Sequence, residues 1–144
     1  PGQKLLAAAR DDDAKEARQA LHAKGAVGYR EPISGLAALH VAASQGSAAV
    51  AKLLLDAHVS PNLKDDRGMT PLHLAILACS HGSLAVAKLL VAAHGDPDAR
   101  TSEGKTPVHC AALGGLKEAV TFLISSHAKL DVQDMNGDMP VHDA

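Results

Sequence analysis

A six-residue pattern recurs along the chain at a nearly constant interval. Its clearest copy is Gly68-Met69-Thr70-Pro71-Leu72-His73, and variants of it occupy residues 35–40, 104–109 and 137–142. The last residue of each copy is a histidine, at positions 40, 73, 109 and 142, which gives intervals of 33, 36 and 33 residues. Such a period predicts a stacked repeat protein, in which each unit buries its apolar face only against its neighbours.

Each repeat also carries the pattern of a half-buried helix towards its end. Apolar side chains recur there at i, i+3 and i+4, as expected for one buried stripe: Val50, Leu53 and Leu54; Val86, Leu89 and Leu90; Ala119, Phe122 and Leu123. The residue just past this helix is expected in the left-handed backbone region, which favours glycine and tolerates histidine better than most residues. These closing residues are Gly25, His58, His94 and His127.

The six-residue pattern has the features of a helix start. Proline suits the first helical turn because its missing N–H would have no partner there, and the preceding threonine can cap that turn. With its period, the Thr-Pro-Leu-His element resembles the ankyrin repeat over nearly the whole chain. The resemblance implies threonine and histidine side chains that hydrogen-bond locally and between repeats. Ala37 and Met139 stand where that threonine is expected, so the bonds at those two corners are in question.

The resemblance implies an all-α fold, an ankyrin-type α-solenoid of stacked helix-turn-helix repeats. The connectors between repeats, such as residues 58–68, are expected to form β-hairpin-like fingers that project from the stack. We expect a single domain over residues 1–144, and the sequence ends inside a repeat, as a piece of a longer protein would. Its expected units are an N-terminal capping repeat at 1–34, repeats at 35–67, 68–103 and 104–136, and the start of a truncated repeat at 137–144.

The capping repeat is expected to contain two helices, over residues 3–10 and 14–24. Asp11-Asp12-Asp13 lies between them and can cap the second helix while complementing its dipole. Arg18, Gln19 and His22 occupy positions that are apolar in later repeats. A terminal repeat must present a polar outer face to water, which explains this substitution pattern.

One repeat departs from the others in length. Six residues separate His40 from Gly46, and the interval from His109 to Gly115 is the same, but nine separate His73 from Gly82. The three extra residues lie within 74–81 and either lengthen the first helix by almost a turn or bulge the loop that follows. Either outcome would make a local bump that could shape a binding site next to the concave face.

Composition and charge exclude several classes of function. The 14 basic and 16 acidic side chains give a formal charge of −2, so no basic field attracts nucleic-acid phosphates and no nucleic-acid partner is expected. No apolar run approaches the roughly 18 residues of a membrane span, so no membrane partner is expected. Cys79 and Cys110 lack metal-type spacing and are too few for a disulfide scaffold. This favours an intracellular location, cytoplasmic and/or nuclear, with Cys110 buried as a small apolar residue.

The sequence contains no pattern typical of catalysis or of cofactor binding. Of nine histidines, four end the recurring pattern and three close helices, and none shows the close spacing of metal ligands. Gly104-Lys105-Thr106 resembles the end of a phosphate-binding loop, but Ala99 stands where that motif needs glycine. We therefore expect no catalytic residue, no cofactor and no metal ion, and we do not expect an enzyme.

By its resemblance, the chain is expected to bind a partner protein or peptide, as a scaffold or adaptor, and to be monomeric as a fragment. Contacts in the family usually come from the finger tips and from the exposed edge of the first helices. The positions that correspond here are Ile33, Ser34, Leu36, Ser44, Gln45, Asp66, Arg67, Met69, Ser80, His81, Ser102, Glu103, Lys105, Leu113, Met135, Asn136 and Asp138.

Within this set, apolar anchors would be surrounded by charged residues that set specificity. The anchors are expected to be Ile33, Leu36, Met69, Leu113 and Met135. Met69 is expected at the centre of a patch whose rim includes Arg67, Glu103, Lys105 and the Ser80-His81 bump. Two alternatives remain: a substrate-recruiting or regulatory arm of a larger multidomain enzyme, and an inhibitory or masking domain for a signalling or transcription factor. Fold alone does not decide among them.

Overall fold

The computed structural model describes residues 2–23, 27–130 and 137, which form eight α-helices and no β-strand. The helices are α1 (Gly2–Asp11), α2 (Ala14–Leu21), α3 (Ala38–Gln45), α4 (Ala48–Asp56), α5 (Pro71–Ala78), α6 (His81–Ala92), α7 (Pro107–Leu113) and α8 (Lys117–Ser125). The all-α prediction is confirmed.

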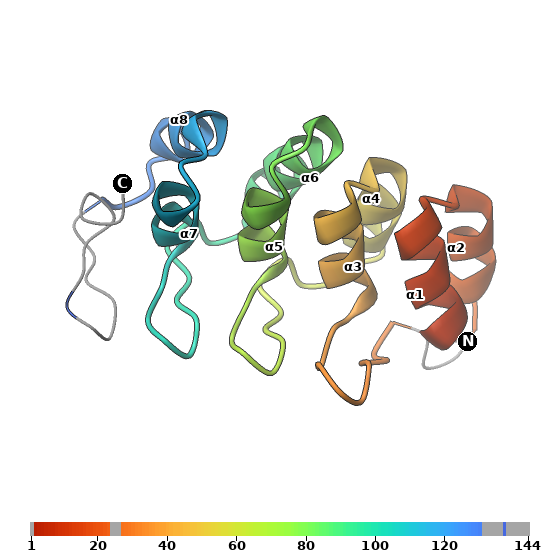
Figure 1. Cartoon of the computed structure of the whole chain (residues 1–144). Helices are drawn as coiled ribbons and strands as arrows, with labels where there is room; N and C mark the ends of the chain where they lie inside the picture. The colour runs from red at the N-terminus through yellow and green to blue at the C-terminus, as the bar shows by residue number, and fades with distance from the viewer. Residues whose placement is uncertain (1, 24–26, 131–136, 138–144) are drawn as a thin grey trace.

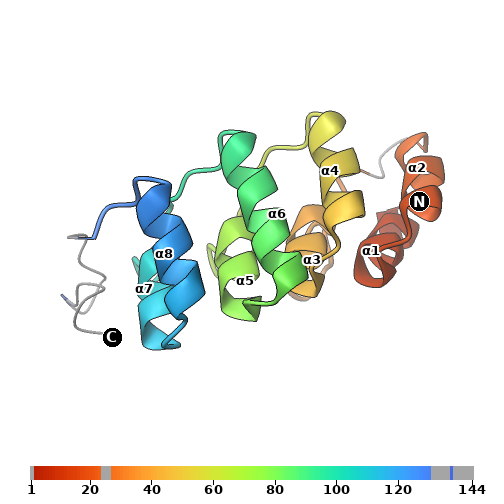
Figure 2. The same ribbon diagram turned by 90° about the horizontal axis from the view of Figure 1, so that it is seen from above.

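The helices form antiparallel pairs that stack side by side along the chain (Figure 1). The inner helices α1, α3, α5 and α7 make one layer, and the outer helices α2, α4, α6 and α8 make a second (Figure 2). Packing follows this order, since α3 contacts both α1 and α5, while α4 contacts α6. Buried alanines on the inner helices, including Ala42, Ala75 and Ala111, allow neighbouring repeats to approach closely. The apolar stripes of α4, α6 and α8 pack on this core, as predicted.

The recurring pattern forms the corner that joins each finger to its inner helix. Thr70 is the N-cap of α5 and Pro71 is its first residue, and the Thr70 hydroxyl accepts a hydrogen bond from the His73 amide at 3.4 Å. The His73 ring nitrogen Nδ1 accepts from the Thr70 amide at 3.2 Å, so Nε2 carries the ring proton and donates to the Lys105 carbonyl at 3.0 Å. His73 therefore connects two repeats, as the resemblance implied.

The same arrangement recurs with one substitution. His40 contacts the Met69 carbonyl of the next repeat at 3.0 Å, although Ala37 offers no side-chain cap to α3. The Ala37 amide still donates to His40 Nδ1 at 3.2 Å, so the corner keeps its shape. Met139, the other position without the threonine, lies outside the described residues.

Three fingers project from the inner-helix side of the stack (Figure 1). We name residues 31–36 the first finger, 65–69 the second and 101–105 the third. Each closes by backbone hydrogen bonds across a turn, such as Asp65 N–H to the Met69 carbonyl at 2.9 Å and Thr101 N–H to the Lys105 carbonyl at 2.9 Å. The fingers are thus hairpin-like, as implied, but the described residues contain no regular strand pairing.

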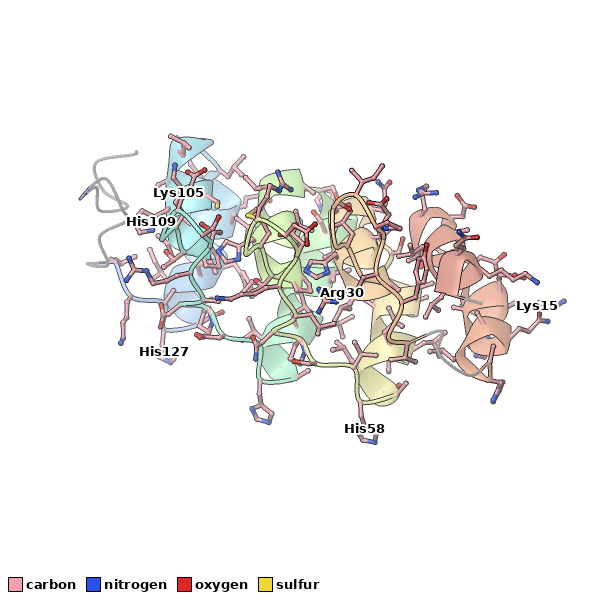
Figure 3. The ribbon with its side chains drawn as sticks, turned by 90° about the horizontal axis from the view of Figure 1, so that it is seen from below. Lys15, Arg30, His58, Lys105, His109 and His127 are labelled. Atoms are coloured by element: carbon pink, nitrogen blue, oxygen red, sulfur yellow. The ribbon has the colours of Figure 1, made fainter. Side chains whose placement is uncertain are left out.

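The residues that close the outer helices adopt the backbone conformation predicted for them. His58, His94 and His127 have φ angles of 64°, 70° and 63°, in the left-handed region. All three are exposed, and Figure 3 shows His58 and His127 pointing away from the ribbon along one edge. Gly25, the remaining closing residue, lies outside the described residues.

Replacing His58 or His127 with glycine should leave the free energy of unfolding unchanged or raise it by up to about 1 kcal/mol. Glycine adopts this backbone conformation without the penalty that a side chain incurs, and part of that gain is offset by its greater freedom in the unfolded chain. Urea denaturation of each single variant measures the effect. A clear loss of stability would mean that these imidazoles make bonds that the left-handed geometry does not explain.

The three-residue insertion lies in neither place predicted from the sequence. Helix α5 has 8 residues, as α3 does, so the first helix is not longer. Cys79, with φ 43°, ends α5 six residues after His73, where Gly46 ends α3 after His40. The extra residues instead extend the second helix at its start, since α6 has 12 residues while α4 has 9. Ser80 makes this possible because its hydroxyl caps the lengthened helix by accepting from the Ser83 amide at 3.1 Å.

The capping repeat follows its prediction closely. Helix α1 begins one residue earlier and ends one residue later than expected, and α2 ends at Leu21, before the predicted end at residue 24. Asp13 is the N-cap of α2 and accepts a hydrogen bond from the Glu16 amide at 3.0 Å. Arg18, Gln19 and His22 are exposed, which confirms the polar outer face. Elsewhere, Cys110 is buried as predicted.

Candidate protein-binding surface

The fingers are held to one another by backbone hydrogen bonds. The Asp66 amide donates to the Ser34 carbonyl at 3.1 Å, and the Ser102 amide donates to the Arg67 carbonyl at 3.0 Å. The Ser102 hydroxyl adds a second bond to that carbonyl at 2.8 Å. These bonds fix the three fingers as adjacent rows, so side chains on them are held in defined positions before any partner arrives.

A cleft lies where the second and third fingers meet helices α5 and α7. Its volume is about 250 Å³, and it is lined by Arg67, Met69, Leu77, Thr101, Ser102, Glu103, Lys105, Cys110 and Leu113. Six of these nine residues belong to the set carried over from the ankyrin resemblance. The structure therefore brings together a group that is spread over 47 residues of sequence, from position 67 to position 113.

The apolar part of the cleft comes from the last turns of two inner helices. Leu77 on α5 is 47% exposed, and Leu113 on α7 is 60% exposed. Leu113 was predicted as an anchor, whereas Leu77 was missed. The sequence contained the signal, because Leu77 follows His73 by four residues and Leu113 follows His109 by four. Exposed leucines at equivalent positions in neighbouring repeats form the kind of apolar centre that binding surfaces use.

Charged groups border the cleft. Arg67 is 72% exposed and lies 3.7 Å from the Asp65 carboxylate, which is itself buried. That carboxylate also accepts from the Arg67 and Met69 amides, at 2.9 Å each, so it orders the second finger. Both Glu103 and Lys105 belong to the third finger, where Glu103 is exposed and Lys105 is half-buried. Both signs of charge thus surround the two leucines.

Met69 does not occupy the position predicted for it. Its side chain is only 8% exposed, and it packs beneath the cleft. Its amide donates to the Asp65 carboxylate in the same finger, and its carbonyl accepts from His40 of the preceding repeat. These two bonds hold the backbone so that the side chain turns inward. Truncating Met69 would create a core cavity as well as alter the surface, and Leu77 and Leu113 are the accessible apolar groups instead.

Ser80 and His81 lie outside this cleft, contrary to the expected patch. They line a separate hollow of about 540 Å³ between the starts of α6 and α8, together with Cys79, Gly115, Leu116, Lys117 and Glu118. Their displacement follows from the insertion, because the extra residues extend α6 and not the segment beside the fingers.

The remaining predicted contacts are distributed along the first finger and α3. Ile33 is 90% exposed at the finger tip, where the Glu31 carboxylate accepts from the Ile33 amide at 3.1 Å and from the Ser34 hydroxyl. The bond from Ser34 contributes most to lowering the pKa of Glu31. Gln45 and Asp66 are exposed, whereas the half-buried contacts are Ser34, Leu36 and Ser44. Met135, Asn136 and Asp138 lie outside the described residues.

Neither a metal centre nor a membrane span is found in the described part of the chain. No group of three or more His, Cys, Asp or Glu side chains within residues 2–23, 27–130 and 137 is arranged to hold a metal ion. Among the helices described above, none has the length and hydropathy needed to cross a membrane.

Comparison with known proteins identifies the family. A stretch of 61 residues is 46% identical to Protein phosphatase 1 regulatory subunit 12A of Mus musculus and, equally, to that of Rattus norvegicus. This stretch covers 42% of the chain but only 6% of either relative's length. The family described as ankyrin repeats (3 copies) matches residues 5–77 and 76–144. The chain therefore belongs to the ankyrin-repeat family.

Proposed function

We propose that the chain is a protein-recognition module whose cleft and fingers bind a partner protein or peptide, as a scaffold or adaptor. Ankyrin repeats are binding modules, which supports the general role. The observation that carries the specific proposal is the pair of exposed leucines, Leu77 and Leu113, in one cleft with charges at its border. A partner side chain that fills the cleft would bury both leucines and displace water from them.

A second candidate is a regulatory arm of a larger enzyme or enzyme complex. The similarity to a regulatory subunit of protein phosphatase 1 favours this reading over the masking of a transcription factor. Both candidates use the same surface. They differ in whether the bound partner, or a larger protein that includes this chain, contains a catalytic domain. Affinity capture with the full-length protein, followed by a phosphatase assay of the captured material, separates them.

Replacing both Leu77 and Leu113 with glutamate should weaken binding of the captured partner by at least about 2 kcal/mol, roughly 30-fold in affinity. Leu77 is 47% exposed and Leu113 is 60% exposed, so a glutamate at either position can reach water and the fold should survive the substitution. Isothermal titration calorimetry with the captured partner measures the loss, and the thermal unfolding midpoint checks the fold.

Ile124→Glu is the matched control. Ile124 is 51% exposed on the outer helix α8, away from the fingers, so this variant places one glutamate at a comparable apolar site and matches each leucine substitution made singly. Lys52→Glu and Lys88→Glu test the exposed faces of α4 and α6 in the same way. If these outer-helix variants lose the partner while the leucine variant retains it, the cleft is not the binding surface.

A further inference from the structure

The tip of the first finger presents an ordered apolar side chain to water. Ile33 is 90% exposed, the highest value among the large apolar side chains in the part of the chain that the structure describes. The Glu31 carboxylate accepts from the Ile33 amide at 3.1 Å and from the Ser34 amide at 2.9 Å. The Ser34 carbonyl in turn accepts from the Asp66 amide of the second finger at 3.1 Å. Because the tip is already fixed, burying Ile33 in a pocket requires little further ordering.

The cleft between the second and third fingers is an apolar pocket of suitable size. Its volume of about 250 Å³ lies below the roughly 300–1,000 Å³ of small-molecule sites, so it suits one inserted side chain. Leu77 and Leu113 are exposed in it. Ile33 does not line the cleft of its own molecule, because the backbone bonds between fingers hold the first finger beside the second. Only the Ile33 side chain of another molecule can therefore fill it.

The second finger, which lies between the first finger and the cleft, carries two adjacent charges of opposite sign. Asp66 and Arg67 are both exposed. Within residues 2–23, 27–130 and 137 the Asp66 carboxylate forms no ion pair, and the Arg67 side chain stays 72% exposed despite its contact with Asp65. Around a two-fold axis, residue i of one copy meets residue j of the other, and j meets i. A finger with Asp66 next to Arg67 is therefore complementary in charge to a second copy of itself.

We propose that the finger sides of two copies of this chain pair about a two-fold axis near the second finger, with Ile33 of each copy seated in the cleft of the other. The three fingers project side by side in chain order (Figure 1). A two-fold axis near the middle finger reverses that order in the second copy, so each first finger faces the opposite copy's third finger. Both isoleucine contacts form together, and Asp66 of each copy faces Arg67 of the other.

A second copy is favoured as the occupant because the tip, the cleft and the self-complementary charges all belong to one surface of this chain. The pairing goes beyond the partner binding proposed above but uses the same cleft, so the two compete. It also departs from the monomer expected from the sequence, because the cleft exists only in the folded stack.

Sedimentation equilibrium of the 144-residue chain, at concentrations up to about 1 mM, tests the pairing. The wild type should form a dimer and no larger species, because a two-fold contact closes on itself. Ile33→Ser, or Leu77→Ser together with Leu113→Ser, removes both apolar contacts of a self-pair. Each change should raise the dimer dissociation constant about 25-fold, which is about fivefold per contact. Ile124→Ser on α8 is the matched control and should leave the constant unchanged.

Mixing the two serine variants separates lost contacts from lost folding. The mixed pair keeps one Ile33 opposite one intact cleft, so it should associate about fivefold more tightly than either variant does with itself. Fluorescence-detected sedimentation, with one variant labelled, measures this gain. A mixture that binds no more tightly than its components would overturn the proposal.

Charge exchange tests the two-fold axis. Asp66→Lys and Arg67→Glu each bring like charges together and should weaken the dimer about threefold, whereas the double variant restores opposite pairs and should recover the wild-type constant. A wild-type chain that stays monomeric at every concentration, or that forms open-ended species, would contradict the pairing. Binding of the captured partner that still depends on Leu77 and Leu113 would in that case leave the proposed function standing.

Discussion

Gly46→Ala is expected to lower the free energy of unfolding by about 3 kcal/mol. Gly46 has φ 73°, and a side chain in the left-handed region costs about 1–2 kcal/mol. A Cβ at this position would also lie 2.9 Å from the Gly82 carbonyl carbon and 2.9 Å from the Ser83 nitrogen. Both contacts are backbone atoms of the extended start of α6, so relief requires the repeats to move apart, at a further cost of about 1–3 kcal/mol.

Gly115→Ala is the matched control. Gly115 has φ 65° and occupies the same position two repeats further along, six residues after His109, but a Cβ there meets nothing within 4 Å. This variant should lower the free energy of unfolding only by the penalty for a side chain in the left-handed region, about 1 kcal/mol. Urea denaturation measures both variants. Equal losses would show that the extension of α6 does not pack on Gly46 as described.

Acid should weaken the stack between pH 6.5 and pH 4, by up to about 3 kcal/mol from His73 alone. Burial of the His73 ring lowers its pKa from 6.5 to about 4, and the bond to the Lys105 carbonyl only partly offsets this. Protonation at Nδ1 would place a donor against the Thr70 amide, which is itself a donor. Burial lowers the pKa of His40 as well, so its contribution has the same sign.

The sign of this pH dependence follows from proton uptake by the folded and unfolded states. Above pH 6.5 both states carry a neutral imidazole at position 73, and its contribution to stability is fully present. As the pH falls from 6.5 towards 4, the unfolded chain binds a proton that the folded chain does not, so the free energy of unfolding decreases. Below about pH 4 both states are protonated and the contribution has been lost.

His73→Gln separates this effect from the titration of carboxylates. The variant should be less stable than the wild type at pH 7, because it loses the repeat-to-repeat bond, and the difference should shrink as the pH is lowered to 4. Urea denaturation at several pH values measures both proteins. A difference that stays constant with pH would contradict a depressed His73 pKa.

The fold was predictable because the sequence signal for each helix start, helix end and repeat junction occurs in several repeats. Thr70 and Pro71 start a helix, His73 joins two repeats and His58 ends a helix, and each has counterparts elsewhere in the chain. Even the unusual left-handed histidines followed from their position after an apolar stripe. The physical cause is that every unit must bury the same faces against its neighbours.

The length of the insertion was predicted correctly, but its place was wrong because Gly82 was taken as the counterpart of Gly46. Counting from His73 to Gly82 assumed that glycine must end the inner helix, but Cys79 adopts the left-handed conformation in its place. Ser80 then provides a cap for a longer α6, which propensity and spacing alone did not reveal. Ser80 and His81 were therefore predicted beside the fingers, whereas they line a hollow between the starts of α6 and α8.

The candidate surface was only partly predictable. Arg67, Glu103, Lys105 and Leu113 do line one cleft, because neighbouring repeats align equivalent positions. Burial of Met69 accompanies a hydrogen bond to Asp65 within the second finger and one to His40 of the preceding repeat, and the second bond forms only through tertiary packing. Whether these residues contact a partner stays a prediction.

The claim that the finger side binds the partner is tested most directly by methyl NMR of the complex. The protein is labelled at leucine and isoleucine methyl groups and the captured partner is left unlabelled. The account predicts intermolecular contacts at Leu77, Leu113 and Ile33, with the Ile124 methyl resonance unchanged. Contacts at Ile124 on α8, with Leu77 and Leu113 unaffected, would contradict it and place the binding surface on the outer helices.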